Sequence, residues 1–260
     1  MNTEDWRNFD PTMGIKCEQK DMKKIATWAK QFHHRLQILW DNGCSSNEVA
    51  ILPATTGNLK ELLAKIESRQ APTLLYLSGH TEVIGQEHIY LTLDSLQQGG
   101  ISSDMALRYS EMGRQLVSRG SSKPLIWVTE IDECDNFTEL PYVYRCEAGQ
   151  VKCEKTGFKW PWGKAQALHF AATSPNQRAI TFEGSSGAIY TSALQRVTLG
   201  QDLSLGEIAL NIQLTMDELL ECARCPETQQ HRIYSSHRFD QDDLFTALGF
   251  TLRPSSCQMA

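Results

Sequence analysis

The chain has 260 residues, of which 41% are hydrophobic, and a formal net charge of −6. This length can bury one sizeable core, so a single domain is expected rather than two smaller ones. The acidic balance leaves no basic surplus to neutralise phosphates, which argues against a nucleic-acid partner. No apolar run approaches the ~18–20 residues that span a bilayer, and residues 1–14 do not have the pattern of a secretory signal. We therefore expect a cytoplasmic protein without a membrane partner.

The predicted helices begin with residues 21–41, where apolar side chains recur at three- and four-residue steps and Asn42 and Gly43 follow. A second helix is expected after the turn at Thr55 to Gly57. Further helices are predicted over residues 104–119, from near 187 or 190 onward, and over 204–222. Apolar runs predict strands within residues 48–54, 71–80, 88–94, 123–134, 166–175 and 231–239.

Strong apolar strands that alternate with helices are typical of a mostly parallel sheet covered by helices on both faces. In such sheets the ligand site lies at the carboxyl ends of the strands. His80 and Cys134 both follow apolar runs, at two such ends. Because they are 54 positions apart, they can meet only through the fold. A thiolate paired with an imidazole base would suit acyl transfer, and Gly79 would let the chain turn beside the oxyanion.

Three carboxylates surround this cysteine in the stretch of residues 131–137, and negative neighbours favour a neutral thiol. Period-two alternation predicts that Asp132 and Cys134 project to one side of the strand end and Glu133 to the other. The alternatives are a buried structural thiol at Cys134 and a hydrogen-bonded turn histidine at His80.

Eight cysteines at irregular spacing predict reduced thiols rather than a disulfide framework. Cys222 and Cys225 are the one close pair, followed by His231 and His237. Their spacing does not fit the usual zinc finger, so we interpret them as two thiols at the end of a helix.

The order of these segments resembles the caspase-like domain of clan-CD cysteine peptidases, in particular the metacaspase-related proteins of fungi. The segment "LLYLSGHTEV" is similar to the strand and turn that carry the catalytic histidine, and "LIWVTEIDECDNF" to the strand that carries the nucleophile. The segments "ALHFAATSPNQRA" and "GAIYTSAL" are similar to the later strand and helix. The likeness covers nearly all of residues 14–250 and implies an α/β three-layer sandwich with a mostly parallel central sheet.

The resemblance implies His80 as general base and Cys134 as nucleophile of a cysteine endopeptidase that forms an acyl-enzyme. The backbone N–H groups of Thr81 and Cys134 would bind the oxyanion. Asp132 and Ser78 match positions that line a pocket for a basic side chain, so Arg or Lys would be preferred at P1. The partners would be protein or peptide substrates.

The chain also departs from the family pattern. Thr81 and Glu133 stand where the family commonly has glycine and a first cysteine. The calcium-binding acidic cluster of many metacaspases is reduced to residues near Asp94 and Asp104, so no cofactor is expected and calcium is only weakly supported. Residues 1–13 read as an N-terminal extension and 14–260 as one caspase-like domain. The family's first strand is atypical or missing, because residues 1–12 contain Asn, Asp and Pro.

The stretch 147–164 is expected to be a loop rich in lysine. A peptidase that prefers basic residues could cut itself there, whereas the simpler interpretation is a solvated loop whose Trp160 and Trp162 cover the edge of the core. Three functions remain open. The first is the cysteine endopeptidase, and the second is a catalytically inactive caspase-like domain acting as a regulator or interaction module. The third is an α/β binding protein with an accidental Cys/His pair.

Overall fold

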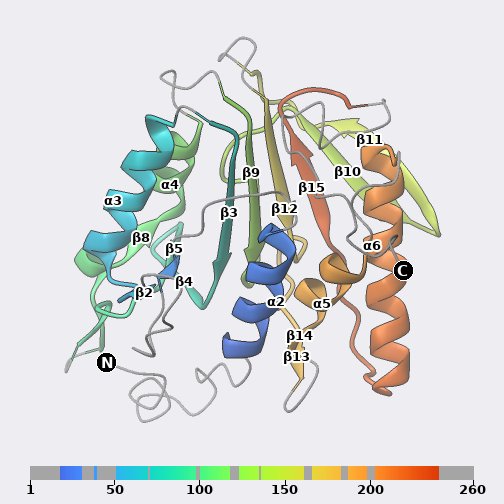
Figure 1. Ribbon diagram of the computed structural model, residues 1–260, viewed down its shortest axis with the longest axis horizontal. Helices are drawn as coiled ribbons and strands as arrows, with labels where there is room; N and C mark the ends of the chain where they lie inside the picture. Colours follow the sequence, from blue (N-terminus) through green and yellow to red (C-terminus); the bar gives the residue numbers. More distant parts are fainter. Residues whose placement is uncertain are drawn as a thin grey trace, which may run out of the picture.

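The computed structural model is shown in Figure 1. It describes ten stretches of the chain: residues 18–30, 38–39, 51–69, 71–97, 100–117, 123–134, 136–160, 166–182, 187–197 and 203–239. The predicted N-terminal extension, residues 1–13, lies outside them. Among the described residues, no helix is long and apolar enough to cross a membrane.

A six-stranded sheet forms the centre of the molecule, with strand order β11-β10-β15-β12-β9-β3. Three of its strands are parallel and adjacent: β3 (Thr73–Ser78), β9 (Leu125–Glu130) and β12 (Ala167–Ala171). The other three pair antiparallel: β15 (Arg232–Ser235), β10 (Tyr142–Glu147) and β11 (Gln150–Lys155). Every residue of β9 and β12 is buried, because both faces of these central strands are covered.

Helices cover the two faces of the sheet and complete a three-layer sandwich (Figure 1). One face carries α2 (Glu18–Lys30), α5 (Ile189–Arg196) and α6 (Leu205–Cys222). The other carries α3 (Thr56–Glu67) and α4 (Tyr109–Leu116). Alternation along β9 separates the two cores, since Ile126 and Val128 pack on the first face and Leu125 and Trp127 on the second. The predicted α/β sandwich is confirmed.

Short elements surround this frame. A three-stranded sheet follows β3 and contains β4 (Thr81–Ile84), β5 (Glu87–Tyr90) and β8 (Leu107–Arg108). The remaining pairs are β1 (Ile38–Leu39) with β2 (Ile51–Leu52), β6 (Leu96–Gln97) with β7 (Gly100–Ile101), and β13 (Thr181–Phe182) with β14 (Gly187–Ala188). A 3₁₀ turn, η2, spans Ser103–Met105.

Several predicted boundaries are wrong. The helix expected over 21–41 ends at Lys30, and Ile38–Leu39 is a strand parallel to β2. The helix expected over 104–119 is preceded by η2 and β8 and begins only at Tyr109. The atypical first strand expected before residue 14 lies outside the described residues.

Part of the expected loop 147–164 is a strand. Residues 150–155 form β11, which pairs with β10 across a two-residue turn at Ala148 and Gly149. Both turn residues have positive φ, 49° and 75°, which suits the twist of a tight hairpin. Lys152 and Lys155 therefore lie in a hydrogen-bonded strand, while Lys164 and Trp162 lie outside the described residues.

Candidate active site

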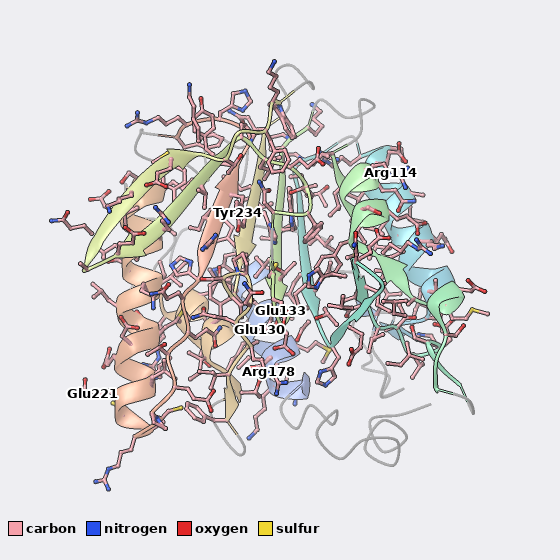
Figure 2. The ribbon with its side chains drawn as sticks, turned by 180° about the vertical axis from the view of Figure 1, so that it is seen from behind. Arg114, Glu130, Glu133, Arg178, Glu221 and Tyr234 are labelled. Atoms are coloured by element: carbon pink, nitrogen blue, oxygen red, sulfur yellow. The ribbon has the colours of Figure 1, made fainter. Side chains whose placement is uncertain are left out.

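The predicted site lies at one edge of the sheet, where the parallel strands β3 and β9 end. Pairing continues up to Ser78 and Glu130, the last residues of the two strands. Beyond them, Gly79 N donates to Glu130 O at 3.4 Å and Thr81 Oγ1 donates to Asp132 O at 3.4 Å. The segments that carry His80 and Asp132 therefore run on side by side past the strand ends. Figure 2 labels Glu130 and Glu133 at this edge, with Arg178 from the loop after β12.

His80 is held by the turn between β3 and β4. Tyr90 crosses this turn and donates its hydroxyl to Ser78 O at 2.8 Å. A Cβ on Gly79 would lie 2.8 Å from that hydroxyl, so a larger residue here would have to displace the Tyr90 ring. Nε2 of His80 is buried and has no hydrogen-bond partner among the described residues. The turn thus positions the imidazole of His80 through the backbone, and Nε2 makes no hydrogen bond to the described residues.

The chain after β9 does not continue as a strand. Asp132 and Glu133 form a turn in which Glu133 has φ = 49°, a left-handed conformation that costs a non-glycine residue roughly 1–2 kcal/mol. Glu133 N donates to Gln177 O at 2.7 Å, which helps to hold this conformation. The predicted alternation of Asp132 and Cys134 is therefore wrong, because period two ends with the strand at Glu130.

Cys134 points into the protein. Its side chain is 0% exposed, and Sγ lies 2.9 Å from Thr129 Oγ1 and 3.5 Å from His169 Nε2. Its backbone N–H, the predicted oxyanion donor, donates to Thr173 Oγ1 at 2.9 Å. Thr173 in turn donates to Ile131 O at 3.1 Å. In this conformation both the thiol and the amide of residue 134 are engaged in the core.

His169 is the histidine in contact with the thiol, and the sequence analysis missed it. It lies in β12, fully buried, with its ring stacked between Trp127 and Tyr234. Burial lowers the pKa of His169 to about 3, so the ring is neutral near pH 7. Its Nε2 lies 2.8 Å from Thr129 Oγ1, while Nδ1 is buried and has no hydrogen-bond partner within the described part of the chain. A buried unpaired N–H costs more than a lone pair there, so we assign the proton to Nε2.

With that tautomer His169 donates to Thr129 and cannot take a proton from Cys134. The pair is compatible with a dyad by distance alone, since 3.5 Å is within the range of a hydrogen bond to sulfur. The only signal for His169 in the sequence is a polar residue inside an otherwise apolar strand, which also fits a structural histidine.

The predicted specificity residues, Ser78 and Asp132, are both half-buried at the strand ends. Asp132 Oδ1 accepts a hydrogen bond from Ala179 N at 2.7 Å, so the loop after β12 orients this carboxylate. Thr81 begins β4 and contacts Asp132 O through its side chain. Asp135 lies outside the described residues.

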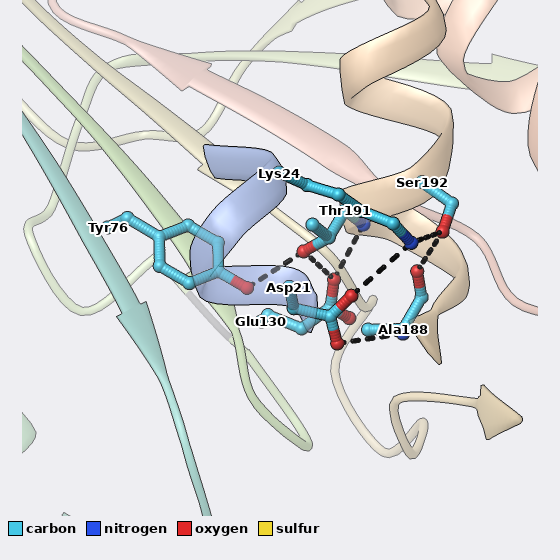
Figure 3. A network of polar contacts seen from close by, with 7 residues as sticks. All are labelled: Asp21, Lys24, Tyr76, Glu130, Ala188, Thr191 and Ser192. Carbon is cyan, nitrogen blue, oxygen red and sulfur yellow. Dashed lines mark hydrogen bonds and ion pairs between the residues drawn. The ribbon is translucent and has the colours of Figure 1, made fainter. Parts of the chain in front are cut away.

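A further buried acid, Glu130, lies beneath this edge and was not singled out from the sequence. It is 4% exposed, and Oε2 accepts hydrogen bonds from the backbone N–H and the hydroxyl of Thr191 (Figure 3). Burial raises the pKa of Glu130 to about 8. Asp21, from α2, lies in the same network and accepts a hydrogen bond from Ala188 N at 3.0 Å.

The acids considered for calcium do not form a cluster. Asp104 is exposed on η2, whereas Asp94 Oδ1 accepts hydrogen bonds from Thr56 N and from the hydroxyls of Thr56 and Thr92. Within the stretches that the structure describes, no group of three or more His, Cys, Asp or Glu residues could hold a metal ion.

No protein-family model matches the chain, and no curated protein matches it in sequence. Among solved structures, the fold is similar to caspase-1 from Spodoptera frugiperda. The TM-score is 0.53 at 12% sequence identity, over 87% of this chain and 81% of that one. At this distance the likeness concerns the fold. The chain has a caspase-like α/β fold, with its candidate site at the carboxyl ends of the parallel strands.

Proposed function

We propose that this chain is a catalytically inactive caspase-like domain that acts by binding a protein or peptide partner. The observation that carries the proposal is the state of Cys134. Its thiol contacts Thr129 and His169, and its backbone N–H is bonded to Thr173, all inside the core. A cysteine nucleophile must meet the substrate carbonyl, and its oxyanion donors must face the developing charge.

The second candidate is the cysteine endopeptidase with His80 as base and Cys134 as nucleophile, cutting after Arg or Lys. It is favoured by the caspase-like fold and by the uncommitted Nε2 of His80 at the same edge of the sheet. This function requires the turn of residues 131–134 to rearrange, so that the amide leaves Thr173 and the thiol leaves Thr129. Self-processing would then be sought near Lys159, since Lys152 and Lys155 are held in β11.

An arginine-directed acylating probe separates the two candidates. The folded chain is incubated with the probe, with calcium or with a chelator, and adducts are localised by tandem mass spectrometry. We expect no adduct at Cys134. An adduct that forms at Cys134 in the native chain and is lost in His80→Ala would establish the endopeptidase and overturn the proposal. Cys134→Ser is the control for labelling elsewhere, since exposed Cys222 is also present.

A further inference from the structure

We infer that residue 132, rather than residue 134, stands where this scaffold presents a nucleophile to His80, and that Asp132 fills this position. The inference rests on the proposed function and deepens it, because it names Asp132 as the residue that replaces the nucleophile and leaves the domain without peptidase activity. It follows from the register of β3 and β9 and from the turn that comes after β9.

The register of the two strands places His80 level with Asp132. Ser78 pairs with Glu130, a register of 52 positions (130 − 78), and the two hydrogen bonds past the strand ends share one spacing of 51 positions (130 − 79 and 132 − 81). Gly79 bonds to Glu130, which continues the ladder, and Thr81 then bonds to Asp132 two residues further along each chain. His80 lies between these contacts, 52 positions before Asp132 (132 − 80), which is the register of the two strands.

Strand geometry shows why this level matters. Neighbouring strands lie about 4.8 Å apart, so side chains at paired positions can come close enough to transfer a proton from one to the other. Cys134 comes two residues later, after the turn at Asp132 and Glu133, and its thiol lies in the core beside Thr129.

Asp132 cannot act as the nucleophile that a cysteine thiol would provide at this position. The carboxyl group of Asp132 forms no thioester, and its Oδ1 accepts a hydrogen bond from Ala179 N. His80 is thereby left with a buried Nε2 that has no hydrogen-bond partner among the described residues. The site therefore has His80 as a base at the strand ends, with Asp132 in the position where a nucleophile would stand.

Restoring a thiol at this position tests the inference. Asp132→Cys is prepared alone and with His80→Ala, and its reaction with iodoacetamide is followed by tandem mass spectrometry near pH 6.5. In this reaction sulfur bonds to carbon, iodide leaves and His80 takes the thiol proton. Val83→Cys is the matched control, because Val83 is 51% exposed on the hairpin that follows His80. Exposed Cys222 is the internal reference in every sample.

We expect Asp132→Cys to react at least about tenfold faster than Val83→Cys, and to lose this advantage with His80→Ala, because an adjacent imidazole stabilises the thiolate. An equal rate with and without His80 in a folded variant would overturn the inference. Labelling of native Cys134 by the arginine-directed probe would instead overturn the proposed function, so the two failures are distinct.

A disulfide measurement decides the question if Asp132→Cys does not fold. His80→Cys keeps native Cys134 and is exposed to oxidised glutathione, which accepts the two electrons when two thiols join. A bond to Cys134 requires Cα atoms within about 7 Å and would overturn the inference. We expect none, and we expect the double variant H80C/D132C to form the bond wherever it is folded.

Discussion

The carboxylate of Glu130 accepts two hydrogen bonds from Thr191, one from the backbone N–H and one from the hydroxyl, both at 2.8 Å. Thr191 lies in the first turn of α5, whose N-cap, Ala188, makes no side-chain cap. The strand therefore provides the cap that the helix lacks, and it does so from the last residue before the candidate site (Figure 3). The energetic consequence is a buried carboxyl that titrates near neutral pH.

Glu130 should make stability fall as the pH rises. Its folded pKa of about 8 exceeds the ordinary glutamate pKa of 4.5, so the native state binds the extra proton between these values. The free energy of unfolding should then decrease with pH in this window, by up to about 1.4 kcal/mol per unit. We expect Glu130→Gln to weaken this decline, measured by urea unfolding across the window. Glu221→Gln, at an exposed carboxyl, should keep the wild-type slope, and an unchanged slope in Glu130→Gln would contradict the assignment.

His169 should make the free energy of unfolding decrease as the pH falls into the acid range. Burial lowers its pKa to about 3 from 6.5, so the unfolded state binds the extra proton between these values. The contribution of neutral His169 to stability is therefore complete above about pH 6.5 and is lost as the pH falls toward 3. We expect His169→Phe to flatten this acid limb in urea unfolding, since Phe can stack between Trp127 and Tyr234. His231, whose pKa burial lowers to about 4, should retain part of the limb in that variant. A variant limb as steep as the wild type would contradict a neutral buried His169.

The continuous apolar runs predicted the central strands correctly, because residues buried on both faces leave a signal that no loop imitates. The positions where those strands end were less predictable. Residues 131–134 carry no sequence signal that Glu133 adopts positive φ. This conformation is supported by a hydrogen bond from Glu133 N to Gln177 O, a residue distant in the sequence. The predicted alternation extends past the end of the strand at Glu130, and it placed Cys134 on the same side as Asp132.

Polar residues inside the predicted strands were the other omission. Glu130 and His169 both lie within apolar runs, and their importance depends on partners supplied by other elements, Thr191 and Thr129. Sequence periodicity identifies the strand on which such a residue lies, but its partner depends on packing between segments. His80, by contrast, was predicted at a strand end because glycine marks the turn beside it.

Gly113 should be required for the loop after Cys134 to pack on α4. A Cβ at this position would lie well inside contact distance of the backbone oxygen of Phe137. Alanine favours helices by up to about 1 kcal/mol over glycine, yet we expect Gly113→Ala to destabilise the protein by roughly 1–3 kcal/mol. Gly57→Ala is the matched helical control, since its Cβ would meet nothing within 4 Å. Equal unfolding free energies for the two variants would refute the close approach of α4 and the loop.

Asp94 should serve the fold and not a calcium ion. Partial burial raises the pKa of Asp94, but hydrogen bonds from Thr56 and Thr92 outweigh it and hold the pKa below its ordinary value. Hydrogen bonds to a charged group contribute about 1.5–3 kcal/mol, so Asp94→Ala should lower the unfolding free energy by roughly that amount. Asp104→Ala, on exposed η2, should change it by less than about 0.5 kcal/mol. Thermal unfolding with calcium and with EDTA should give the same midpoint for the wild type. A wild-type midpoint that is raised by calcium, with no such rise in Asp94→Ala, would instead identify a metal site at this residue.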